Sequence, residues 1–198
     1  MTRFRFLVDF WTTTLNRELF QPAPGLPAQD IGRSRREGFD LEARYYLLQE
    51  ARGTVSMFAN YTQLRTRLID RRPSIVVPNV AQSIVNLGTD FDTPLGGPNS
   101  PHRLSGLVYF QLIGQKNLTE DGLLTTNPYE RIGGRLAYSH RSGWTGFVDV
   151  IWYPGDRLSE TAFNFGPATG ASPSDIVVSP QPPVTVLGGV SYRFRTGS

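Results

Sequence analysis

The chain has 198 residues, of which 39% are hydrophobic and 12% aromatic, and its formal net charge is +3. It contains no cysteine, which excludes disulfides, thiol nucleophiles and thiolate metal sites. No stretch reaches the roughly 18 consecutive apolar residues of a membrane helix, and no signal-peptide pattern opens the sequence. The 20 glycines and 15 prolines favour strands and turns over helices.

Eight segments alternate between apolar and polar residues with a period of two, which is typical of β-strands with two different faces. In chain order the predicted strands are Arg3–Leu15, Gly38–Leu48, Gly53–Arg67, Ser83–Phe91, Leu104–Leu112, Arg131–Ser139, Trp144–Tyr153 and Val184–Phe194. No segment keeps a helical period. The sequence therefore predicts a single all-β unit over residues 1–198, with antiparallel up-and-down strands that form either a partial barrel or a small closed barrel.

The connections between these strands alternate in length. Those after the second, fourth and sixth strands are the shorter set, at 49–52, 92–103 and 140–143. Those after the first, third, fifth and seventh strands are mostly longer, at 16–37, 68–82, 113–130 and 154–183. Up-and-down membrane barrels have tight turns at one rim and long loops at the other. This sorting favours a membrane barrel over a soluble sandwich.

Aromatic residues occupy the positions expected for the borders of a membrane. The last strand carries Val190, Tyr192 and Phe194 on one face, and we interpret these as a C-terminal barrel signature. Trp144 and Trp152 share a face and lie roughly 26 Å apart at ~3.3 Å per residue. A tilt of ~40° reduces this to about 20 Å, slightly less than the apolar band of about 25 Å.

The alternation also predicts which side chains meet lipid, because an arginine at the lipid-facing midplane costs about 2–4 kcal/mol. The residues assigned to the lipid face are Phe39, Leu41, Ala43, Tyr45, Ile132, Leu136, Tyr138, Val148, Val150, Val186, Val190 and Tyr192. Leu47 continues the same alternation at the end of the second strand. Those assigned to a charged lumen are Asp40, Glu42, Arg44, Arg131, Arg135 and Asp149. Four other arginines, at 35, 36, 71 and 72, are predicted to be loop charges.

Four sequence runs together resemble the C-terminal barrel of TonB-dependent outer-membrane receptors. Residues 34–42, SRREGFDLE, look like the family's S-R-R-x-G strand opening, with Asp40 in place of Glu. Residues 59–62, ANYT, are similar to the strand that follows it. Residues 77–80, VPNV, leading into 86–91, resemble the next strand step, and 189–194 resemble the terminal strand.

This resemblance implies a place and a function for the chain. Such receptors are 22-stranded barrels closed by a plug, and eight strands correspond to about the last third of one barrel. The resemblance implies a non-enzymatic role in active uptake across a Gram-negative outer membrane, with lipid and lipopolysaccharide as partners. The ligand would be a siderophore, haem, cobalamin or glycan. The plug and the segment that contacts TonB have no counterpart in these residues.

Two other functions remain open on the sequence. A free-standing eight-stranded outer-membrane barrel would have a structural or adhesive role, and a soluble ligand-binding barrel would bury the same apolar residues inside. Phe163 and Phe165, in the long connection after the seventh strand, are candidate ligand contacts. No nucleic-acid partner is expected, because no aromatic–basic motif accompanies the arginines.

Catalysis and cofactor binding have little support. His140 and Ser142 could form a nucleophile pair, but residues 141–143 indicate a turn that would break their shared face. His102 follows Pro101 and has no second ligand nearby in the sequence, so no metal site is expected. The sequence predicts no catalytic, cofactor-binding or metal residues.

Overall fold

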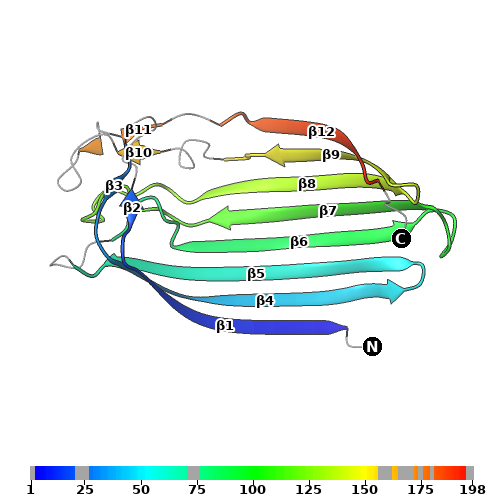
Figure 1. Ribbon diagram of the computed structural model, residues 1–198, viewed down its shortest axis with the longest axis horizontal. Coiled ribbons are helices and arrows are strands. Elements are labelled where there is room, and N and C mark those ends of the chain that lie inside the picture. The colour runs from blue at the N-terminus through cyan, green and yellow to red at the C-terminus, as the bar shows by residue number, and fades with distance from the viewer. Residues whose placement is uncertain are drawn as a thin grey trace.

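The structure, a computed structural model, describes residues 3–20, 27–70, 76–155, 162–164, 172–173, 176–178 and 181–194. Eight strands form one antiparallel sheet, and each long strand pairs with the next along the chain (Figure 1). These strands are β1 (Phe4–Leu15), β4 (Ser34–Glu50), β5 (Gly53–Leu68), β6 (Ser83–Pro94), β7 (His102–Ile113), β8 (Tyr129–His140), β9 (Trp144–Trp152) and β12 (Val184–Tyr192). The predicted all-β, up-and-down fold is confirmed.

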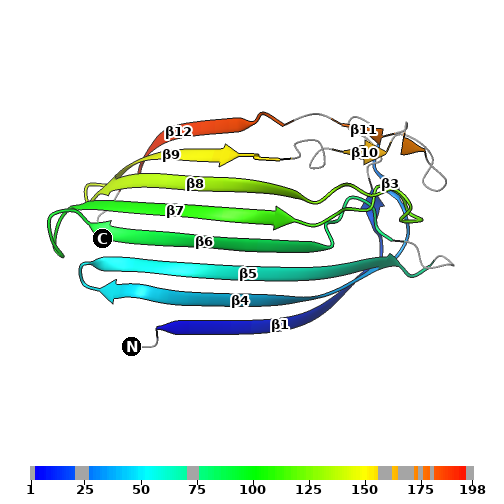
Figure 2. The same cartoon turned by 180° about the vertical axis from the view of Figure 1, so that it is seen from behind.

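The sheet is open and forms a single curved layer (Figures 1 and 2). Among the described residues, β1 pairs only with β4 and β12 pairs only with β9, so the two strands lie at opposite margins of the sheet. Of the two predicted forms, the small closed barrel is not the one observed, and the open sheet is consistent with a partial barrel. Both margins present unpaired backbone groups along their outer sides.

The long and short connections lie at opposite ends of the sheet, as predicted (Figure 1). The end with the long connections also carries two short hairpins that the sequence did not predict. One pairs β2 (Leu19–Phe20) with β3 (Gln29–Asp30), and the other pairs β10 (Phe163–Asn164) with β11 (Ile176–Val177). Two-residue strands have too little alternation to be recognised from sequence.

Strand β4 differs from its prediction in two places. It begins at Ser34, four residues early, because Ser34 pairs with both Leu15 and Leu68. Arg35 and Arg36 are therefore strand residues, and their prediction as loop charges was wrong. Near its other end the register shifts between Tyr46 and Leu48. This bulge leaves Leu47 out of the pairing, and Leu48 takes the position opposite Val55 on the apolar face.

Aromatic rings lie over glycines on the neighbouring strand at several points of the sheet. A Cβ added at Gly38 would come within 2.8 Å of the Trp11 ring, and one at Gly189 within 2.6 Å of the Phe147 ring. Tyr109 lies over Gly133 in the same way. A ring can lie flat on the backbone there because glycine has no side chain, which stabilises curved sheets.

We expect Gly133→Ala to destabilise the protein by about 1–3 kcal/mol, because the new methyl group would overlap the Tyr109 ring. Gly146, on the adjacent strand β9, is the matched control, since a Cβ there meets nothing within 4 Å. Gly146→Ala should be neutral or slightly stabilising. Denaturant unfolding of the two variants measures the difference. Equal effects would contradict the ring-over-glycine contact.

Candidate functional site: the two faces of the sheet

The strand register separates apolar and polar side chains onto two faces. Leu41, on β4, lies opposite Val8 and Tyr61, and the row continues in the same way across the sheet. Farther along, Leu136 lies opposite Val148, which lies opposite Gly188. The twelve residues assigned to the lipid face all share one face of the sheet. The predicted grouping of these residues on one face is therefore confirmed.

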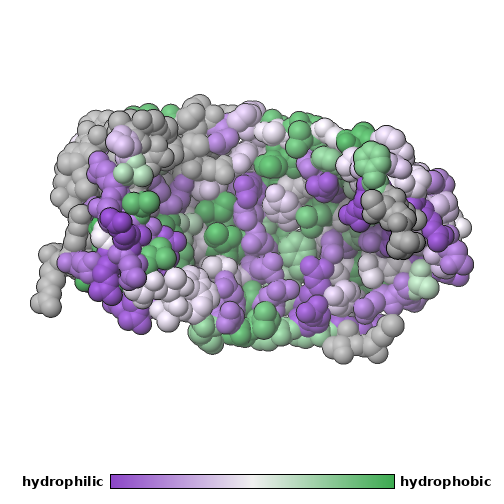
Figure 3. All heavy atoms as spheres, viewed as in Figure 1, coloured by the Kyte–Doolittle hydropathy of each residue, from purple (hydrophilic) through white to green (hydrophobic). Residues whose placement is uncertain are grey.

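In a soluble domain the apolar face of a sheet is buried and the polar face is exposed, whereas here the apolar face carries the more exposed side chains. On the apolar face, Val108 is 62% exposed, Leu136 52% and Val190 71%. On the polar face most side chains of β5 to β9 are half-buried. In the view of Figure 3, hydrophilic residues spread over the middle of the sheet and hydrophobic residues gather towards its margins. A contiguous exposed apolar surface, such as the face that carries Val108, Leu136 and Val190, is typical of a contact with lipid or with another protein.

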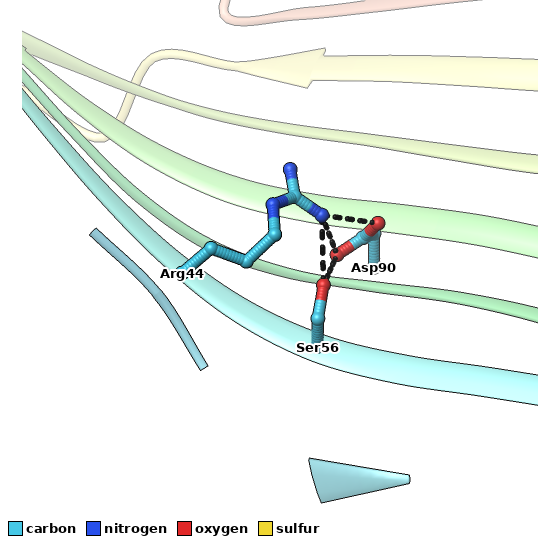
Figure 4. Close-up of polar contacts among 3 residues, drawn as sticks. All are labelled: Arg44, Ser56 and Asp90. Carbon is cyan, nitrogen blue, oxygen red and sulfur yellow. Dashed lines mark hydrogen bonds and ion pairs between the residues drawn. The ribbon is translucent and has the colours of Figure 1, made fainter. Parts of the chain in front are cut away.

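The best-defined polar cluster joins three adjacent strands (Figure 4). The Arg44 guanidinium donates hydrogen bonds to the two Asp90 carboxylate oxygens at 3.0 and 2.9 Å and to the Ser56 hydroxyl at 2.8 Å. Ser56 also donates to Asp90 and is buried. Charge-assisted bonds at partly buried positions hold the three strands in register.

Further polar contacts follow the same face. Arg135 and Asp149 form an ion pair at 3.5 Å between β8 and β9. The Trp11 indole N–H donates to Asp40 at 2.7 Å, and the Thr62 hydroxyl donates to the same carboxylate at 2.6 Å. Asp40, Arg44, Arg135 and Asp149 therefore lie on the predicted charged face. Asp90 was missed, because only the register reveals its pairing with Arg44.

A small core lies at the end of the sheet with the long connections. It consists of Ile31, Leu68 and Val77, with Val80 packed against it. Beside it, buried Glu18 accepts a hydrogen bond from Ser34 at 2.5 Å and from Arg36 at 2.7 Å. These contacts tie the connection after β1 to the sheet.

The pKa of the Asp30 carboxyl in the β2–β3 hairpin is lowered. The main cause is the Gly32 backbone N–H, which donates to the carboxylate at 2.9 Å, and the Arg17 guanidinium at 3.0 Å adds to it. Both favour the charged form. The contribution of Asp30 to the hairpin is therefore present near neutral pH and is lost as the pH falls through its lowered pKa.

The predicted ligand-contact residues are only partly within the described chain. Phe163 belongs to β10 and pairs with Val177, whereas Phe165 lies outside the described residues. At the end with the short turns, the predicted C-terminal signature joins an aromatic cluster. The Tyr192 ring lies 4.7 Å from both the Trp144 and the Phe194 rings, between centroids. Strand β12 ends at Tyr192, two residues earlier than predicted.

The two histidines are neighbours, contrary to the prediction for His102. His102 pairs directly with His140 across β7 and β8, and their ring centroids are 4.8 Å apart. His140 Nδ1 lies 2.6 Å from the Ser142 hydroxyl, so the turn brings this pair together rather than separating it. A Ser–His pair that acts as a nucleophile also needs an orienting carboxylate, and Asp149 on β9 is instead paired with Arg135. Within the described ranges, no group of three or more acidic or histidine side chains could hold a metal ion.

The described residues contain no helix of sufficient length and apolarity to cross a membrane. The geometric features that remain for a functional interpretation are the exposed apolar face, the ion-paired polar face and the two unpaired margins. Comparisons with protein-family models, curated proteins and solved structures give no match for this chain.

Proposed function

We propose that the chain is a C-terminal barrel segment of a TonB-dependent outer-membrane receptor, a non-enzymatic component of nutrient uptake. The observation that carries this proposal is the exposure of the two faces. On the apolar face Val108 is 62% and Val190 71% exposed, whereas most polar-face side chains of β5 to β9 are half-buried, and ion pairs such as Arg44–Asp90 join side chains on that face. A lipid-facing outer surface and a polar lumen require this arrangement.

The unpaired margins support a segment of a larger barrel over a complete small one. A sheet edge exposed to lipid leaves its N–H and C=O groups without partners, and each unsatisfied group costs several kcal/mol. Eight strands are enough to close a barrel, yet β1 and β12 do not pair. Additional strands on both margins would satisfy these groups, as a larger barrel provides.

The alternatives differ in what would cover the apolar face. A soluble ligand-binding barrel would enclose Leu41, Leu136 and Val190, whereas Leu136 and Val190 are exposed and Leu41 is half-buried. In the receptor, outer-membrane lipid and lipopolysaccharide would contact this face. TonB would be reached only through regions outside this segment. The transported nutrient would be a siderophore, haem, cobalamin or glycan.

The three tryptophans of the chain provide a test of the membrane assignment. Trp144 and Trp152 lie on the apolar face, while Trp11 lies on the polar face and binds Asp40. Three variants, each retaining one tryptophan and carrying phenylalanine at the other two positions, are reconstituted in vesicles of brominated phosphatidylcholine. We expect strong fluorescence quenching of Trp144 and Trp152, because bromine on acyl chains reaches only lipid-facing rings.

Trp11 is the internal control for this measurement and should be quenched weakly. Equal quenching of all three rings would indicate non-specific adsorption. Quenching of none, in a chain that stays in the aqueous fraction without detergent, would contradict the membrane assignment and favour the soluble barrel.

A further inference from the structure

A basic pocket lies at the short-turn end of the polar face, and neither the resemblance nor the proposed function assigns it a role. Its volume is about 720 Å³. Among the residues that line it are three arginines, Arg103, Arg141 and Arg193, and three hydroxyl residues, Ser139, Thr145 and Ser191. The described lining thus contains three guanidinium groups and no carboxylate.

The floor of the pocket is a row of hydroxyl groups set by the strand register. Ser139 on β8 lies opposite Thr145 on β9, and Thr145 lies opposite Ser191 on β12. On the other side of Ser139, Arg103 of β7 lies directly opposite it, so this arginine stands at the end of the hydroxyl row. Residues directly opposite one another in a sheet point to the same face, so the row presents three hydroxyl groups to one volume.

Two arginines stand beside this row on backbone segments that are held by hydrogen bonds. The Arg141 N–H donates to the Pro101 carbonyl at 2.8 Å, and the Arg193 N–H donates to the Gly143 carbonyl at 3.0 Å. Gly143 has φ of +109°, and a Cβ there would lie 2.5 Å from the Arg193 carbonyl oxygen. Glycine is therefore needed for the chain after β12 to approach the β8–β9 turn.

Of the three arginines that line the pocket, only one is neutralised by an ion pair within the described residues. Arg103 forms an ion pair with Asp92 at 2.9 Å. Arg141 and Arg193 form no ion pair with any residue in the described part of the chain. Guanidinium groups bind phosphate through paired N–H donors, and hydroxyl groups donate to the remaining oxygens.

We propose that this pocket binds a phosphate group, held by Arg141 and Arg193 above the hydroxyl row of Ser139, Thr145 and Ser191. The ligand class is an anionic phosphate group, either free as inorganic phosphate or a phosphomonoester, or as the phosphodiester headgroup of an anionic lipid. The site depends on the register and on the turn geometry, and it does not require the proposed receptor function.

In the test, inorganic phosphate and glycerol phosphate are each titrated into the full chain in a non-ionic detergent. Isothermal titration calorimetry measures the affinity. The variant Arg141→Gln/Arg193→Gln should weaken binding at least tenfold. The control Arg5→Gln/Arg52→Gln also removes two charges, one from the polar face of β1 and one from the β4–β5 turn, and should leave the affinity within about twofold. Circular dichroism verifies that each variant keeps its β-structure.

Two further variants distinguish a specific loss of phosphate binding from a loss caused by misfolding. Arg141→Lys keeps the charge but loses the paired donors, so it should bind with intermediate affinity. Ser191→Ala removes one hydroxyl from the row and should weaken binding about threefold to tenfold. Vesicles of phosphatidylcholine, with and without phosphatidylglycerol, then separate the two sources of the phosphate group.

Binding of the small phosphates identifies a soluble ligand. If they do not bind, tighter association with vesicles that contain phosphatidylglycerol than with vesicles of phosphatidylcholine alone identifies a lipid headgroup. Either result supports the site, provided that the Arg141→Gln/Arg193→Gln variant weakens that binding at least tenfold and the control variant leaves it within about twofold. Absence of binding to all of these probes, or equal weakening by the control, would overturn the proposal.

Discussion

Val108→Arg is expected to lower the free energy of unfolding in lipid vesicles by about 2–4 kcal/mol. Val108 lies near the middle of β7 and is 62% exposed on the apolar face. If that face meets lipid, the substitution places a guanidinium close to the bilayer midplane, where no water or counter-charge compensates it. Urea unfolding of the reconstituted chain, followed by tryptophan fluorescence, measures the change.

Leu107→Arg is the matched control for this substitution. Leu107 is the adjacent residue on the same strand, faces the polar side and lies opposite Asp90 and Arg135. The new arginine would meet a carboxylate as well as a like charge, and we expect less than half the effect of Val108→Arg. A neutral Val108→Arg, or a larger effect at Leu107, would exclude a lipid-facing apolar surface.

Cysteine pairs placed on the two margins should fail to form disulfides within one chain. The chain has no native cysteine, so each double variant reports a single pair. Val8→Cys on β1 is combined in turn with Val186→Cys, Gly188→Cys and Val190→Cys on β12, which samples several registers. A disulfide requires Cα atoms within about 7 Å, and we expect none because β1 and β12 are not paired.

Val8→Cys/Leu41→Cys is the positive control, because Val8 and Leu41 are directly opposite in the register of β1 and β4. This pair should oxidise readily, as seen by a mobility shift that dithiothreitol reverses. Oxidation of any β1–β12 pair to a similar extent would show that the sheet closes on itself. That result would contradict the proposal of a receptor segment and would favour a free-standing eight-stranded barrel.

The pattern of side chains along each strand could be predicted because it is a local property. Successive residues of a strand point to opposite faces, so the alternation of Leu41 with Asp40 and Glu42 already assigns each to its face. The sorting of long and short connections was visible for the same reason, since connection lengths follow from where the alternation stops. Local patterns therefore predicted eight strands, their order and their two faces.

The alternation fails where pairing with another strand overrides it. Ser34 belongs to β4 because Leu15 and Leu68 supply backbone partners on both sides. Leu47 falls out of the pattern because β4 carries one more residue than β5 opposite it, and only the paired register reveals such a bulge.

The polar sites were decided by tertiary structure, because their members are distant in sequence. Arg44 meets Asp90 across 46 positions, and the pairing exists only once β4, β5 and β6 are in register. Arg141 and Arg193 line the same pocket only because the chain after β12 contacts the β8–β9 turn. The sequence by itself determined which residues share a face, because that depends on the pleat of one strand. Only the tertiary structure decided which of them meet, because that depends on how the strands align.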